Sequence, residues 1–203
     1  MRLRIKWKSN YYATGGGHDM ENELLEQLLD WVRNRYFGKY RGIVSDNADP
    51  TSRGRLKVKV PAVLGDLEVW AMPCVPYAGK KVGFYSLPEK DTGIWVEFEG
   101  GDPSYAIWTG CFWADNELPD QSDTNIKIWK TESHKIRLDD SADELLVENS
   151  SDSKVTLASD VKTESGGATH TVGSTGVVSE KGATKAEVGD SSYKVNNGAL
   201  EVM

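Results

Sequence analysis

The chain has 203 residues, and its 24 Lys and Arg residues against 31 Asp and Glu residues give a formal net charge of −7. This acidic balance argues against a nucleic-acid-binding protein, because binding to phosphates requires a cationic surface. The sequence has no apolar run of membrane-spanning length. Its start over residues 1–10 is interrupted by charges, so we expect a protein made in the cytoplasm without a secretory signal peptide.

Residues 1–36 are predicted to form an N-terminal arm followed by an amphipathic helix. Gly15-Gly16-Gly17 marks a break in the chain, and Asp19 is a typical N-cap residue. Apolar residues then recur at helical spacing, which predicts a helix over residues 20–36. The stripe consists of Leu24, Leu25, Leu28, Leu29, Trp31 and Val32, and we expect it to pack against a core.

Residues 37–113 contain short β-rich runs separated by turn residues. The clearest run, residues 54–61, alternates strictly, with Leu56, Val58 and Val60 on one side of the strand. The other strands are expected near residues 40–44, 67–73, 81–86, 93–99 and 106–112. About five short twisted strands in this length favour a small closed barrel of the OB type.

A linker over residues 114–124 separates this domain from a repetitive segment, residues 125–203. Apolar pairs two residues apart occur at 126/128, 136/138, 145/147 and 155/157, with turn residues between them. This pattern predicts repeated short strands and tight turns. One or two buried aliphatic residues per strand cannot offset a backbone ordering cost of about 1–2 kcal/mol per residue.

The repetitive segment therefore predicts either disorder or an intertwined trimer in which identical chains share an apolar axis. The regular strand period favours the trimer. The predicted fold is mainly β, with an N-terminal helix, a five-stranded OB-fold barrel and a C-terminal intertwined trimeric β-helix, or β-prism. The predicted trimer core consists of Ile126, Ile128, Ile136, Leu138, Val147, Val155 and Leu157.

The sequence over residues 42–113 resembles the OB domain of phage baseplate assembly protein V and of VgrG-type spikes. The resemblance depends on an ordered set of blocks: residues 42–50, 54–61, 70–74, 77–79, 83–88, 96–103 and 110–113. Residues 134–140 further resemble the first strands of the VgrG needle. The motif residues are Gly42, Asp49, Pro50, Gly54, Arg55, Pro61, Trp70, Gly79, Pro88, Gly101, Asp102 and Gly110.

This resemblance implies a homotrimeric central spike of a contractile tail, a structural protein that pierces the target membrane when the sheath contracts. No large domain precedes the barrel, so a separate hub or tail-tube adaptor protein is expected. No histidine lies near Met203, which predicts a separate PAAR-like tip protein at the C-terminal end. A phage, a bacteriocin, an extracellular injection particle and a secretion system all remain open as the assembly that holds it.

The sequence predicts no enzyme and no cofactor. Glu97 and Glu99 lie on one strand, without a nucleophile or oxyanion motif. Cys74 and Cys111 are too few for a zinc site, so no metal is expected. His170 is the one candidate for a metal site. If its side chain points inward, three copies would meet on the threefold axis and could hold a metal ion or an anion, although an outward, solvated side chain is favoured.

A second hypothesis treats the OB domain as a binding module for nucleic acid or surface polysaccharide. Arg55, Lys57 and Lys59 form a basic strand face that could contact a single strand. The acidic composition of the chain argues against nucleic acid as a partner.

Overall fold

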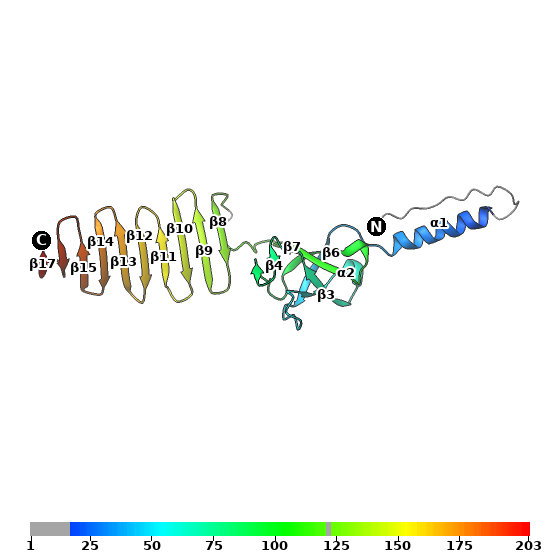
Figure 1. The fold of residues 1–203 in the computed structure, drawn as a ribbon, viewed down its shortest axis with the longest axis horizontal. Helices are drawn as coiled ribbons and strands as arrows, with labels where there is room; N and C mark the ends of the chain where they lie inside the picture. Colours follow the sequence, from blue (N-terminus) through cyan, green and yellow to red (C-terminus); the bar gives the residue numbers. More distant parts are fainter. Residues whose placement is uncertain (1–16, 121–122) are drawn as a thin grey trace. The chain divides into compact units, whose positions relative to one another are not determined.

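The computed structural model describes residues 17–120 and 123–203 (Figure 1). The chain divides after Ala114 into two compact units, which are described separately below. In the described parts, no helix is both long and apolar enough to cross a membrane.

Helix α1 spans Gly17–Arg33, so it begins and ends earlier than predicted. Asp19 lies inside the helix rather than at its N-cap, and residues 34–36 lie beyond its end. The backbone N–H of Tyr36 instead donates to the carbonyl of Gly101 in the barrel, at 2.8 Å. The predicted packing of the leucine stripe is wrong for the single chain, because Leu24 is 60% exposed and Leu29 is 45% exposed.

Five strands close into a barrel in the order β1-β2-β3-β7-β6. The strands are β1 (Tyr40–Asp46), β2 (Leu56–Lys59), β3 (Glu68–Pro73), β6 (Gly93–Phe98) and β7 (Ala106–Cys111). Neighbouring strands are antiparallel except β3 and β7, which pair in parallel. Short helical segments lie at α2 (Pro61–Leu64) and η1 (Glu99–Gly101). The predicted five-stranded barrel is confirmed.

The strand predicted over residues 81–86 is wrong in extent and in partner. Only β5 (Val82–Gly83) is extended, and it pairs with β4 (Ala78–Gly79) in a separate two-stranded sheet. Because β3 pairs directly with β7, the closed barrel has no free edge for a sixth strand.

The barrel encloses the hydrophobic core of the first unit. Alternation along β2 buries Leu56 and Val58 completely and leaves Lys59 exposed, as the sequence pattern predicts. The core consists of Val44, Leu56, Val58, Val60, Ala71, Ile94, Val96, Phe98, Ala106 and Trp108.

The second unit is one ten-stranded antiparallel sheet, β8 to β17, in which each strand pairs with its neighbours in sequence (Figure 1). We call it the C-terminal sheet. The predicted repeat of short strands and turns is confirmed. Its strands are β8 (Ile126–Lys130), β9 (His134–Asp139), β10 (Glu144–Asn149), β11 (Lys154–Leu157), β12 (Val161–Ser165), β13 (Ala168–Gly173), β14 (Gly176–Lys181), β15 (Thr184–Val188), β16 (Tyr193–Val195) and β17 (Leu200–Val202).

Candidate functional site

The register of the C-terminal sheet separates its side chains into an apolar face and a charged face. Directly paired residues point to the same side of a sheet, so the pairings align two rows on the apolar face, one residue per strand. The Val172 row is Lys127, Leu138, Leu145, Leu157, Val161, Val172, Val177, Val188, Tyr193 and Val202. The His170 row is Trp129, Ile136, Val147, Val155, Thr163, His170, Ser179, Ala186, Val195 and Leu200.

Much of the apolar face is exposed in the single chain. Val155 is 37% exposed, Val172 43% and Leu200 58%. On the charged face the side chains of Arg137 and Glu164 are 20% and 21% exposed, and those of Lys154 and Lys162 are 41% and 42% exposed. Valines that are as exposed as the lysines of the opposite face depart from the usual preference for burial of apolar residues. An uncovered apolar surface of this kind marks an interaction surface.

Ion pairs across and along the strands satisfy charges on the charged face within one chain. The Glu164 carboxylate binds the Nζ atoms of Lys154 and Lys162, both at 2.9 Å. The hydrogen bond from Lys154 is the largest cause of the lowered pKa of Glu164. Lys194 and Glu201 form a further pair at 3.1 Å. Opposite charges on adjacent strands reinforce the register that also creates the apolar face.

Five of the seven residues predicted for a shared core lie on the apolar face: Ile136, Leu138, Val147, Val155 and Leu157. Ile126 and Ile128 lie on the charged face, because they pair with Asp139 and Arg137. Trp129, which the sequence interpretation did not select, occupies the corresponding position on the apolar face.

His170 lies on the apolar face, between Thr163 and Ser179 of the neighbouring strands. Its Nδ1 atom is 2.7 Å from the Ser179 hydroxyl oxygen. Ala168 and Val172 share this face, as predicted from the sequence. Within one chain, the described residues form no group of three or more His, Cys, Asp and Glu side chains that could hold a metal ion.

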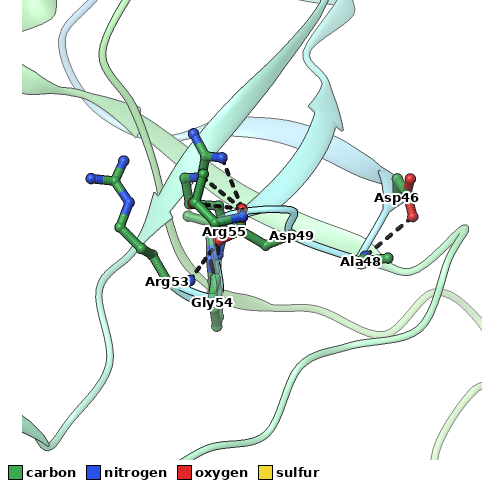
Figure 2. A network of polar contacts seen from close by, with 8 residues as sticks. Asp46, Ala48, Asp49, Arg53, Gly54 and Arg55 are labelled. Carbon is green, nitrogen blue, oxygen red and sulfur yellow. Dashed lines mark hydrogen bonds and ion pairs between the residues drawn. The ribbon is translucent and has the colours of Figure 1, made fainter.

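In the barrel, the motif residues organise the loop between β1 and β2 (Figure 2). The carboxylate of Asp49 accepts hydrogen bonds from the backbone N–H groups of Thr51 at 3.0 Å and Arg53 at 2.7 Å. It also accepts two from the Arg55 guanidinium, at 3.0 and 2.8 Å. The Arg55 hydrogen bonds are the largest cause of the lowered pKa of Asp49. This carboxylate therefore fixes the loop, and Pro50 lies in the turn that it encloses.

The next motif residues join this loop to the core. The guanidinium carbon of Arg55 lies 5.1 Å from the centre of the Trp70 ring, which adds a cation–π contact. The carbonyl of Gly54, a residue with a φ of 71°, accepts a hydrogen bond from the indole N–H of Trp108 at 3.2 Å. The motif therefore has a structural role in this barrel.

Two other motif positions join the barrel to the segment after α1. Asp102 forms an ion pair with Arg35 at 3.2 Å and accepts the backbone N–H of Ser104 at 3.0 Å. Gly101 is buried with a φ of 77°, and a Cβ atom there would lie 3.0 Å from the Phe37 ring.

Gly42 lies inside β1, and the other remaining motif residues occupy turns and strand ends. Pro61 begins α2, Gly79 lies in β4, and Gly110 in β7 has a φ of 147°. The carbonyl of Pro88 accepts a hydrogen bond from the Asn47 side chain at 3.0 Å.

Two carboxylates pair with the three cations of the basic strand face that motivated the binding-module hypothesis, which leaves one net positive charge. Arg55 pairs with Asp49, and the Nζ atoms of Lys57 and Lys59 lie 3.0 and 3.4 Å from the Glu68 carboxylate. These bonds lower the pKa of Glu68, with the hydrogen bond from Lys57 as the main cause. Contacts to phosphates would compete with these internal pairs.

Residues 40–113 match the family model of the type VI secretion system/phage-baseplate injector OB domain. The matched range coincides with the closed five-stranded barrel, so the resemblance found in the sequence is confirmed for this domain. This family implies a structural component of a phage baseplate or type VI secretion system, a class that is not known to be enzymatic. No curated protein matches the chain.

Proposed function

We propose that the chain is the central spike of a contractile injection machine. In this proposal three copies form a homotrimer, with each C-terminal sheet as one wall of a β-prism and its apolar face turned inward. The observation that supports it is the contrast between the two faces. The charged face satisfies its charges within one chain, whereas the apolar face leaves valines such as Val172 about half exposed.

The dimensions of the strands suit a closed prism. Five residues of an antiparallel strand span about 17 Å, so the axis of a three-walled prism would lie about 5 Å from each wall. Valine and leucine side chains can fill that distance from three sides. Full burial of such a side chain is worth about 1.5–3 kcal/mol, so covering the exposed half adds about 1 kcal/mol at each position.

Summed over the two rows, this burial free energy helps to offset the cost of ordering the backbone, which the aliphatic residues of one chain alone cannot offset. Each wall also adds backbone hydrogen bonds along its length, and the charged face gives the outside of the shaft a solvated surface. A narrow shaft of this kind can transmit force along its axis when a sheath contracts, and it needs no enzymatic step.

The proposed partner proteins bind the two ends of the spike. Among the described strands, β17 pairs with β16 alone. An open strand edge requires a cover, which supports a PAAR-like tip protein at the C-terminal end. A separate hub or tail-tube adaptor would bind the barrel, and the spike would meet the target cell membrane only during contraction.

Two adjacent residues of β13 provide a matched test. Val172→Lys places an ammonium group on the apolar face, whereas Thr171→Lys places the same group on the charged face. The mass in solution, measured by light scattering, should fall below that of three chains for Val172→Lys. For Thr171→Lys it should remain that of three chains. A Val172→Lys protein with the wild-type mass and melting temperature would overturn the inward apolar face.

The same pair tests the role in injection. In particles assembled with the variant chain, Val172→Lys should abolish delivery to target cells, and Thr171→Lys should retain it. Full delivery by Val172→Lys particles would refute a spike made of these sheets.

A further inference from the structure

The His170 row is apolar along most of its length but contains three consecutive polar residues. Thr163 of β12 pairs with His170 of β13, which pairs with Ser179 of β14. At the same three strands the Val172 row holds only valines. A polar interruption in an otherwise apolar interior costs free energy unless its groups find partners.

The contact between His170 and Ser179 is compatible with an imidazole that binds a ligand through Nε2. With Nδ1 only 2.7 Å from the Ser179 hydroxyl oxygen, that hydroxyl can accept the Nδ1–H hydrogen bond. Nε2 then carries the lone pair. Metal-binding histidines have this arrangement, in which an oxygen accepts the N–H of the nitrogen that does not bind the metal.

In the proposed trimer, the Nε2 lone pairs of the three copies would face one another near the axis. Three Nε2 atoms that converge near an axis are all acceptors, so they cannot bond one another, and three protonated rings would repel. A cation at their centre satisfies all three at once. Three imidazoles are a known ligand set for zinc, with a water molecule in the fourth position, and imidazole also suits copper, iron and nickel.

We infer that His170 from three copies of the chain forms a binding site for one divalent transition-metal ion inside the shaft. The inference rests on the proposed trimer, because one chain supplies a single ligand. The Thr163 hydroxyl, next to His170 on the same row, is placed to bond a water molecule on the ion. Such an ion would link the three walls at a level where they lack apolar contacts along the His170 row.

The test uses the full-length chain without a histidine tag, stripped of metal by a chelator and titrated with Zn²⁺ or Co²⁺. The inference predicts one ion per three chains and, with Co²⁺, visible absorption bands of a low-symmetry site. His170→Val should abolish binding while the trimer forms, since valine continues the row. His134→Gln, on the same face at the start of β9, should bind one ion as before.

Ser179→Ala removes only the hydroxyl that orients the imidazole. It should weaken the affinity by about tenfold or more without changing the stoichiometry. This variant therefore tests the arrangement without removing the ligand.

The mass of each sample separates the two proposals. A trimer that binds no metal, or one whose metal survives His170→Val, would overturn this inference alone. A trimer that takes up only an anion at this level would overturn it as well. A monomeric wild-type chain would overturn the spike itself.

Discussion

The Asp49 carboxylate accepts two hydrogen bonds from the Arg55 guanidinium, at 3.0 and 2.8 Å, across the base of the loop between β1 and β2. The two side chains are only 3% and 16% exposed. The same carboxylate binds the backbone of Thr51 and Arg53. One ion pair thus fixes the course of the loop and the start of strand β2.

Arg55→Lys should destabilise the barrel. Lysine keeps the charge but loses the paired hydrogen bonds to Asp49 and the contact with the Trp70 ring. Hydrogen bonds to charged groups contribute about 1.5–3 kcal/mol, so we expect a loss of about 1–3 kcal/mol in the free energy of unfolding. Denaturant unfolding followed by tryptophan fluorescence measures it.

Arg53→Lys is the matched control. Arg53 binds Asp49 through its backbone N–H, and its side chain points away from that carboxylate (Figure 2). Its substitution should change the unfolding free energy little. Equal losses for the two variants would refute the specific role of the Arg55 guanidinium.

Gly42→Ala should strain the contact between β1 and β2. A Cβ atom at position 42 would lie 2.9 Å from the carbonyl oxygen of Lys59 and 3.1 Å from a methyl group of Val96. Overpacking of this kind costs about 1–3 kcal/mol. At Gly189 the nearest atom to an added Cβ is 3.9 Å away, so Gly189→Ala should unfold at nearly the wild-type denaturant concentration.

Asp139 should make the C-terminal sheet sensitive to acid. Its pKa is lowered to about 2, first by the Ser141 hydroxyl and then by the Ala142 N–H. A carboxylate with a lowered pKa in the folded state stabilises the fold above its ordinary pKa. This contribution is therefore complete above about pH 4 and is lost as the pH falls toward 2.

Melting temperatures measured between pH 6 and pH 2 test this predicted acid sensitivity of the C-terminal sheet. Asp139→Asn should lower the melting temperature at pH 6 and flatten its fall below about pH 4. Asp140→Asn, whose side chain is 68% exposed, should follow the wild-type curve. An Asp139→Asn protein with the full wild-type acid dependence would show that the Asp139 carboxylate does not cause the acid sensitivity.

Glu164→Gln should destabilise the sheet in a salt-dependent way. Glu164 lies between Lys154 and Lys162, so the neutral amide leaves two ammonium groups close together. The melting temperature should fall at low ionic strength, and the deficit should shrink in about 1 M NaCl, where charges are screened beyond about 3 Å. A deficit that is the same at both salt concentrations would indicate lost packing instead. Glu132→Gln, in the turn between β8 and β9, serves as the control.

The periodicity of the sequence predicts which residues of one strand share a face, but not how successive strands align. Ile126 and Ile128 share a face, as do Ile136 and Leu138, yet the pairing of Lys130 with Lys135 places the two pairs on opposite sides. A hairpin one residue longer or shorter would have reversed this. For the same reason Val178 lies on the charged face and Val177 on the apolar one.

The barrel was easier to predict, because alternation in residues 56–60 and an ordered set of motif residues both indicate the same fold. The interpretation of residues 81–86 as a barrel strand was wrong because barrel closure depends on the parallel pairing of β3 and β7, which local sequence does not encode. The Asp49–Arg55 pair was identified as part of a motif, but its geometry became apparent only in the structure.

The mass of the wild-type chain in solution tests the proposed trimer most directly. Native mass spectrometry at low micromolar concentration should give three times the chain mass of 22.4 kDa. That species should persist on dilution and heating, because the apolar faces of three sheets are buried together. A monomer or a dimer as the dominant species, with a folded C-terminal sheet, would contradict the three-walled spike.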